Sequence, residues 1–244
     1  MLGLLLATAL AAPSAFDHAY AKLDAFYEGA VTPQGVDYTV LGSRRTLLEG
    51  ALSEIAQADT AGFDDAQKLA LVVNAYNAYT VQLILDHPGV RSIRDLDGGN
   101  PWKKRTFRVA GQDLTLDQME HEHARKLADG RVHAVINCAS RGCPPLPPDP
   151  LVPQGLDAQL DAAARRWVGA NAYGVVSGTL FLSRIFEWYA PDFVRWRTDD
   201  VPGADDRQDA ALGFLRAFGL ERIPAHQDVA WRAYDWSLNA APAR

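Results

Sequence analysis

Cysteine is scarce in this chain of 244 residues, where it occurs only as Cys138 and Cys143. Two cysteines alone cannot complete a tetrahedral zinc site, and their C-x4-C spacing differs from the C-x2-C of a zinc knuckle. Glu120 and His123 have a spacing that metal ligands use, but the sequence lacks a second Glu-x-x-His to supply the other half of such a site. The sequence therefore predicts no metal site.

An excess of positive charge is lacking as well. The chain has 24 Lys and Arg against 30 Asp and Glu, and its longest basic cluster is Lys103-Lys104-Arg105. Nucleic-acid binding requires clustered basic residues, so we expect no nucleic-acid partner. The sequence also lacks a glycine-rich phosphate loop, a Walker sequence and a G-x-S-x-G nucleophile elbow, and no cofactor is predicted. The partner class that remains is a small-molecule or peptide substrate.

Long apolar runs are missing except at the start, where Leu2–Ala12 is apolar and is followed by small residues. Eleven residues are too few to span a bilayer, so no transmembrane segment is predicted. The run is typical of a secretory signal, with Ala9-Leu10-Ala11 as the cleavage box, although the positive n-region is missing. The alternative is a buried N-terminal helix. We expect residues 1–15 to be a signal peptide and the protein to be periplasmic or secreted.

With 48% hydrophobic residues, the chain can bury one core of its own. A long segment opens at Asp64-Asp65, ends at Pro88-Gly89 and is apolar on nearly every face, which predicts a central buried helix. The βα rhythm of a doubly wound sheet is missing, so the expected fold is α+β: a single domain of mixed helices and short strands around that helix. The other expected helices cover residues 19–27, 44–58, 116–128 and 156–168, and the expected strands cover 106–114, 133–138, 179–182 and part of 229–239.

Two amides interrupt the central helix. Asn74 and Asn77 are three residues apart and therefore lie on one side of it. A buried amide costs free energy unless it is hydrogen-bonded. Either these side chains bind loop backbone inside the core, or they line a polar cleft.

The stretch from His133 to Cys138 predicts a strand that ends at the first cysteine. In a strand the two side chains point to opposite faces and stand about 16 Å apart, at about 3.3 Å per residue. His133 is therefore expected to point away from Cys138. His121, on the helix that precedes this strand, is the better partner for the thiol.

Several short motifs follow one another along the chain. They are Asn74-Ala75-Tyr76-Asn77, Leu114-Thr115-Leu116 leading to Glu120-His121, Cys138-Ala139-Ser140-Arg141-Gly142-Cys143-Pro144, Leu182-Ser183, Trp188-Tyr189, Asp192-Phe193 and Tyr234-Asp235-Trp236-Ser237-Leu238-Asn239. In this order they resemble the DUF547 family from about Phe63 onward, which makes residues 16–244 a DUF547-like domain. The family is named for an unknown function, so the resemblance implies no substrate. Its histidine-before-cysteine order is similar to that of permuted papain-like hydrolases, an analogy at the level of the fold.

The chemistry we expect is thiol-dependent hydrolysis or acyl transfer on an amide or ester. Cys138 would attack as a thiolate and His121 would take its proton, while Glu120 or Asn77 would fix the imidazole tautomer. All four residues match positions of the family motif.

Asn74, or backbone N–H groups around Ser140-Arg141-Gly142, would stabilise the oxyanion. The alternative is a non-enzymatic periplasmic binding or scaffold domain, in which a Cys138–Cys143 disulfide stiffens the loop and the polar side chains are core hydrogen-bonders. Redox exchange by the cysteine pair is a third reading.

Overall fold

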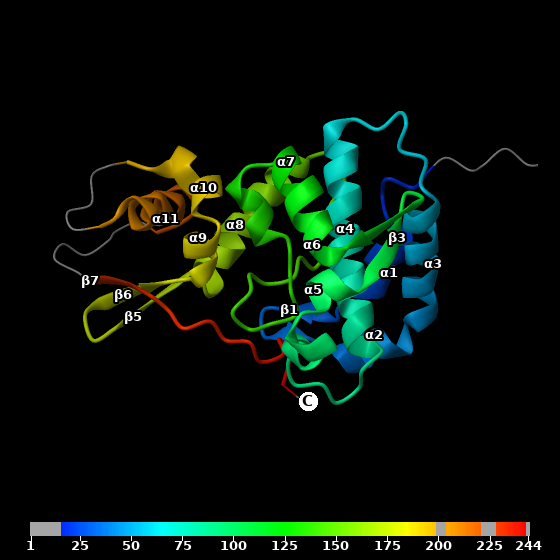
Figure 1. Cartoon of the computed structure of the whole chain (residues 1–244), viewed down its shortest axis with the longest axis horizontal. Coiled ribbons are helices and arrows are strands. Elements are labelled where there is room, and N and C mark those ends of the chain that lie inside the picture. The colour runs from blue at the N-terminus through cyan, green and yellow to red at the C-terminus, as the bar shows by residue number, and fades with distance from the viewer. Residues whose placement is uncertain (1–15, 199–203, 221–227, 243–244) are drawn as a thin grey trace, which may run out of the picture.

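The computed structural model describes residues 16–198, 204–220 and 228–242. The expected signal peptide, residues 1–15, lies outside these described residues. Helices and short strands are mixed along the described chain, which confirms the α+β class (Figure 1). No helix among the described residues is long and apolar enough to cross a membrane.

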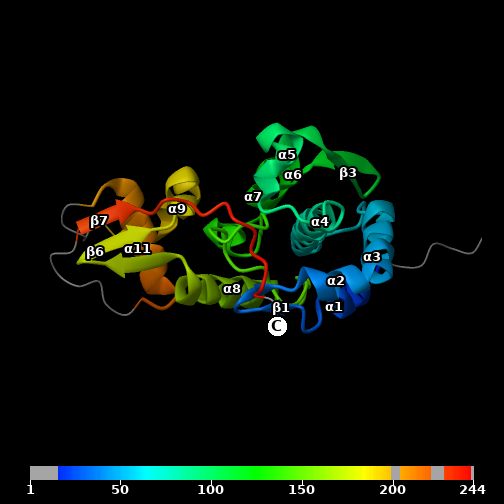
Figure 2. The ribbon, with the colours of Figure 1, turned by 90° about the horizontal axis from the view of Figure 1, so that it is seen from below.

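The predicted central helix is present as α4 (Asp65–Leu85). It begins at a capping box, in which the Asp64 side chain accepts from the backbone of Gln67 and the Gln67 side chain accepts from that of Asp64. Nearly all of α4 is buried, because other helices and a hairpin surround it (Figure 2). The helices on two of its sides are α1 (Ala21–Tyr27), α2 (Tyr38–Ser43) and α3 (Arg45–Gln57).

A hairpin and a helical run cover a third side of α4. Strands β3 (Thr106–Val109) and β4 (Gln112–Thr115) pair antiparallel through Ala110 and Gly111, which both have positive φ, 47° and 74°. Such angles match the twist of a two-residue hairpin. The expected helix over residues 116–128 is also found, but in three pieces. They are α6 (Leu116–Gln118), the π-helical turn η3 (Met119–Ala124) and α7 (Arg125–Leu127).

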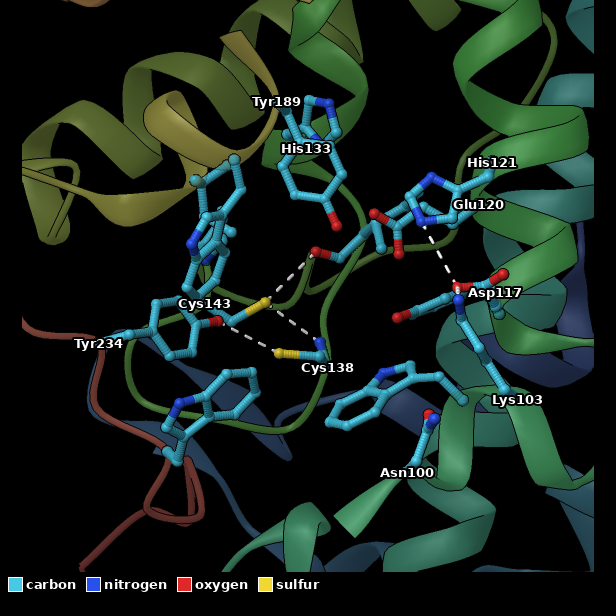
Figure 3. A pocket seen from close by; sticks show the side chains of 17 residues that line it. Asn100, Lys103, Asp117, Glu120, His121, His133, Cys138, Cys143, Tyr189 and Tyr234 are labelled. Atoms are coloured by element: carbon cyan, nitrogen blue, oxygen red, sulfur yellow. Dashed lines mark hydrogen bonds and ion pairs between the residues drawn. The ribbon is translucent and has the colours of Figure 1, made fainter.

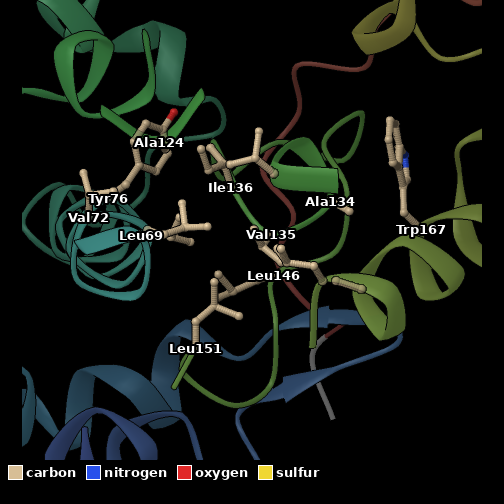
Figure 4. Packing of buried hydrophobic residues seen from close by; sticks show 14 of the residues in the cluster. Leu69, Val72, Tyr76, Ala124, Ala134, Val135, Ile136, Leu146, Leu151 and Trp167 are labelled. Atoms are coloured by element: carbon tan, nitrogen blue, oxygen red, sulfur yellow. The ribbon is translucent and has the colours of Figure 1, made fainter. Parts of the chain in front are cut away.

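The predicted strand over residues 133–138 is wrong. A 3-10 turn, η4 (Gly130–Ala134), is followed by an irregular buried segment up to Cys138. Side chains replace the missing strand partner: Asn77 Oδ1 accepts from the N–H of Asn137 at 2.9 Å, and Asn77 Nδ2 donates to the Val135 carbonyl at 2.7 Å. The segment is apolar because the core encloses it, with Val135 and Ile136 lying among Leu146, Leu69 and Tyr76 (Figure 4).

The C-terminal part of the described chain forms its own group of elements beside the α4 group (Figures 1 and 2). Its three-stranded sheet has β6 in the middle, antiparallel to β5 and parallel to β7. The buried rings of Trp167, Phe186, Phe193 and Phe214 pack together beneath it. The elements are α8 (Leu156–Ala170), β5 (Tyr173–Val176), β6 (Thr179–Leu182), α9 (Arg184–Trp188), α10 (Ala190–Phe193), α11 (Asp206–Ala217) and β7 (Asp228–Trp231).

Residues 232–242, called here the C-terminal strap, run back from β7 to the α4 group (Figure 2). The strap is fixed to the loop of residues 138–144, called here the cysteine loop, by backbone hydrogen bonds: the N–H groups of Arg141 and Gly142 donate to the carbonyls of Ser237 and Asp235, both at 2.8 Å. Gly142 is needed there, because a Cβ at this position would lie 2.9 Å from the backbone nitrogen of Asp235. The remaining short elements are β1 (Val31–Thr32), β2 (Gly35–Val36), η1 (Ile93–Asp95), η2 (Asp97–Gly99), α5 (Pro101–Lys104) and η5 (Val194–Trp196).

Candidate active site

A pocket of about 270 Å³ opens where the α4 group, the C-terminal elements and the strap meet (Figure 3). Its polar lining comes from α5, the helical run, η4 and the cysteine loop. Its aromatic lining comes largely from α9 and the strap. The polar lining residues are Asn100, Lys103, Asp117, Glu120, His121, His133, Cys138 and Cys143, and the aromatic ones are Tyr76, Trp102, Trp188, Tyr189, Tyr234 and Trp236.

Cys138 is a free thiol among several hydrogen-bond donors. Its sulfur lies 3.0 Å from the Ser140 hydroxyl oxygen and 3.3 Å from that of Tyr234. The hydrogen bond from Cys143 and then these two hydroxyls lower the pKa of Cys138 to about 7, although burial opposes them. Donors stabilise the thiolate relative to the thiol, so the structure gives Cys138 the character of a reactive cysteine.

The pKa of Cys143 is shifted in the opposite direction to that of Cys138. Cys143 is free and buried, and burial raises its pKa well above the ordinary range, so it keeps its proton. The sulfur accepts from the N–H of Cys138 at 3.1 Å and lies 3.6 Å from the carbonyl oxygen of Ile136. Its one S–H can donate to that carbonyl or turn to the Cys138 sulfur. Cys143 therefore acts as a proton-bearing neighbour that supports the thiolate of Cys138.

The π-helical turn places His121 on the pocket wall across from the cysteines (Figure 3). Its Nδ1 lies 2.8 Å from Nη1 of Arg125, and its Nε2 lies 3.5 Å from Oδ1 of Asp117. A guanidinium only donates, so Nδ1 must accept and the proton of the ring sits on Nε2. Among the described residues, Arg125 and Asp117 orient this ring, where the sequence had suggested Glu120 or Asn77. No hydrogen bond of the described residues joins it to Cys138.

Glu120 is buried, with only 8% of its surface exposed, and its carboxylate points into the pocket (Figure 3). Its neighbour there is the hydroxyl of Tyr189, which hydrogen-bonds to it. Burial, and then the charge of Glu120, raise the pKa of Tyr189 above its ordinary range, so that the tyrosine donates. Glu120 is thus an inward-facing carboxylate rather than a support for His121.

The expectation that His133 points away from the cysteine pocket is wrong, because it assumed a strand that does not form. His133 lines the same pocket, behind Tyr189, with the two ring centroids 4.1 Å apart. Its Nε2 lies 2.7 Å from Oδ2 of Asp192, which also receives two hydrogen bonds from Arg125. Burial would raise the pKa of Asp192, but His133 and Arg125 outweigh it and hold that pKa well below the ordinary range.

The two central asparagines do not reach the pocket. Asn74 donates to the carbonyl of Leu151 at 2.8 Å and accepts from the N–H of the same residue at 2.9 Å. Asn77 binds the irregular segment before Cys138 in the same two-sided way. Of the two readings left open by the sequence, the structure shows the one in which both amides hold loop backbone inside the core.

Ser140 and Arg141 line a neighbouring pocket and not this one. Ser140 touches the sulfur of Cys138, as described. Arg141 is exposed, faces a neighbouring pocket and donates to the carbonyl of Ala240 at 3.0 Å. Because the backbone N–H groups of Arg141 and Gly142 are bound to the strap, they do not form an oxyanion hole. The structure thus brings Cys138, Glu120 and His121 to one pocket, with the Ser140 hydroxyl against the Cys138 sulfur, and leaves Asn74, Asn77 and Arg141 outside it.

Five site residues were not among the sequence-based candidates: Asp117, Arg125, Tyr189, Asp192 and Tyr234. Three of them, Tyr189, Asp192 and Tyr234, stand in the later motifs that contributed to the family resemblance. That was the one signal in the sequence that pointed to them, and it did not say what they contact.

A family model described as "Protein of unknown function, DUF547" matches residues 60–168. No curated protein and no solved structure matches the chain, so the papain-like arrangement stays a prediction. The matched segment contains the cysteine loop, Glu120 and His121, whereas the facing residues Trp188 to Tyr189 and Tyr234 to Trp236 lie beyond it. This match bears out the resemblance to the DUF547 family over residues 60–168.

Proposed function

We propose that this protein is a thiol-dependent hydrolase or acyl transferase with Cys138 as its nucleophile. The observation that carries the proposal is the Cys138 sulfur, which faces the pocket and has its pKa lowered to about 7 by neighbouring donors. A thiolate is the reactive form of cysteine, and this one is stabilised without a histidine beside it.

In the proposed step, the thiolate adds to the carbonyl carbon of an ester, and the bond from that carbon to the leaving oxygen breaks. The electron pair leaves with the alkoxide, which takes a proton from water, and the acyl group remains on Cys138 as a thioester. Water then adds to the thioester, the carbon–sulfur bond breaks, and the products are a carboxylate, the thiolate and two protons, one of which neutralises the hydroxide formed when the alkoxide was protonated. An acceptor alcohol or amine in place of this water gives acyl transfer.

His121 takes a different part in this proposal from the one expected from the sequence. With Nδ1 accepting from Arg125, the ring presents an N–H and not a lone pair at Nε2. A neutral imidazole of this kind donates a hydrogen bond to the carbonyl oxygen on which negative charge develops. Amide cleavage additionally needs an acid to protonate the leaving nitrogen, so esters are the first substrates to test.

The experiment is acyl-enzyme trapping with a panel of aryl and alkyl esters of increasing acyl length, read by intact and peptide mass spectrometry. We expect one acyl group on the Cys138 peptide and hydrolysis faster than in buffer. Cys138→Ala should lose both. Cys143→Ser, which keeps a donor beside the sulfur, is the matched control and should keep both. Acylation spread over lysines, with equal turnover in Cys138→Ala, would contradict the proposal.

The scaffold alternative has a separate test, because it requires the two cysteines to be bonded. Native protein treated with iodoacetamide, with and without a reductant, should be labelled at Cys138 in both samples. Labelling that appears only after reduction would favour a Cys138–Cys143 disulfide and a non-enzymatic domain.

We also propose that the protein is exported, from the apolar run at Leu2–Ala12 and its small-residue boundary. The mature N-terminus, read by N-terminal peptide sequencing of the fractionated protein, should lie near Ala12 or Phe16 in the periplasmic or secreted fraction. Intact Met1 on protein from the cytoplasmic fraction would contradict export.

A further inference from the structure

A buried carboxylate without a cationic partner lies in the middle of the proposed site. Glu120 is 8% exposed and points into the pocket (Figure 3). Among the described residues it makes no ion pair, although burying a carboxylate is costly unless an opposite charge or several donors compensate it. The hydroxyl of Tyr189 is one donor. The carboxylate thus has capacity for a further, positively charged donor on the pocket side.

The other charged side chains that line the pocket are already matched. Lys103 lies 3.5 Å from Asp117, so these two lining residues offset each other. Arg125, whose charge interacts with that of Glu120, is bound through two nitrogens to Asp192. The ring of His133 lies against the same Asp192 carboxylate. The charge of the lining that has no ion-pair partner is the negative charge of Glu120, and the thiolate of Cys138 adds a second negative charge.

Aromatic rings surround this charge. Tyr76 and Tyr189 line the pocket together with Trp102, Trp188 and Trp236. Trp188 and Trp236 have ring centroids 6.0 Å apart, and Trp188 is 47% exposed. Aromatic faces attract cations through the ring quadrupole and give up little hydration energy when they do so. A carboxylate within such walls is suited to an ammonium group and poorly suited to an anion.

We infer that the pocket selects substrates that carry an ammonium group, which Glu120 binds while the acyl carbon lies at Cys138. The inference deepens the proposed function and rests on it for the identity of the reacting atom. Binding of the ammonium group itself does not depend on turnover. It therefore has a test of its own.

The test compares three probes of similar size, n-butylammonium, n-butanol and butyrate, by isothermal titration calorimetry on the full chain at pH 6, where most of Cys138 is protonated. We expect butylammonium to bind at least about tenfold more tightly than the other two, since hydrogen bonds to charged groups are worth about 1.5–3 kcal/mol. Glu120→Gln keeps the side-chain shape and should remove this preference. Glu122→Gln, which removes the same charge from an exposed position in the same π-helical turn, should leave it intact.

Two outcomes overturn the inference: equal affinity of the wild-type protein for all three probes, or an unchanged preference in a folded Glu120→Gln variant. The first needs no variant, so it decides the matter even if Glu120→Gln fails to fold. Either outcome would leave the proposed acylation of Cys138 unaffected. Conversely, an unreactive Cys138 in a protein that still prefers butylammonium would refute the proposed function and keep the cation site.

Discussion

Replacing Cys143 by alanine removes the largest cause of the lowered pKa of Cys138. The substitution takes away a buried S–H that donates to the thiolate, and it also deprives the N–H of Cys138 of its acceptor at 3.1 Å. The Ser140 and Tyr234 hydroxyls stay in place. We therefore expect the pKa of Cys138 to rise from about 7 toward the ordinary value, which is about 8.5 for an unperturbed cysteine.

The size of the rise follows from the energy of the lost hydrogen bond. A hydrogen bond to a charged group contributes about 1.5–3 kcal/mol, and one pKa unit corresponds to about 1.4 kcal/mol, so the expected shift is about one to two units. The change in rate at fixed pH is smaller. At pH 7 a thiol of pKa 7 is about half ionised against about 3% for one of pKa 8.5, but its thiolate is about fivefold less nucleophilic, which leaves about a threefold advantage.

The midpoint of the pH profile is therefore a better measure than the rate at one pH. The assay is the rate of iodoacetamide labelling of the Cys138 peptide between about pH 5.5 and 9.5, with a reductant removed just before labelling. The wild type should give a midpoint near 7 and Cys143→Ala a midpoint near 8 to 9. Cys143→Ser keeps a donor and should shift less. A wild-type midpoint near 8.5, or identical midpoints in all three proteins, would refute the account of the thiolate given above.

Other predictions concern the supports of the site. Asn77→Ala leaves a buried carbonyl and a buried N–H unpaired and should lower the free energy of unfolding by about 2–5 kcal/mol, measured by urea denaturation. Asp192→Asn should lower the free energy of unfolding by about 3 kcal/mol at pH 7. Because the folded pKa of Asp192 is depressed, the stabilisation by its carboxylate is present above about pH 4 and is lost below it. The free energies of unfolding of the wild type and the variant should therefore converge in acid. Gly142→Ala should force Asp235 and the strap away from the cysteine loop. It should therefore lower the melting temperature and also raise the pH midpoint of Cys138 labelling. A variant that changes only one of these two quantities would contradict the dependence of the Cys138 thiolate on the strap.

The sequence predicted the helices well because their signals are local. The central helix follows from its apolar length and the acidic residues at Asp64-Asp65, and the capping box of Thr115 and Gln118 marks the start of the helical run. The strand expected over residues 133–138 failed for a physical reason. A short apolar run is buried in either case, and periodicity cannot reveal that the Asn77 side chain, from far along the chain, satisfies its backbone.

The sequence predicted only part of the candidate site, because contacts between residues far apart in the chain leave no local signal. Cys138, His121 and Glu120 were identified from chemistry and motif order, and they do line one pocket. The residues around them could not be predicted, because Asp192 is 59 positions from His133 and Tyr234 is 96 positions from Cys138, the residues that they contact. Side-chain type gives no information on such contacts, and the tautomer of His121 depends on one of them: Arg125 is held in place by Asp192.

The pocket is built from two stretches of chain that lie far apart in the sequence, and the C-terminal strap is one of them. Cys138 and Glu120 belong to the segment that the family model matches, while Tyr234 and Trp236, on the strap, line the same pocket from outside that segment. The strap reaches the cysteine loop through backbone hydrogen bonds, which depend little on the side chains that it carries. Exchanging its aromatic residues would thus alter what the pocket admits while the chain path stays the same. Chemistry and selectivity could diverge independently among proteins that share the matched segment.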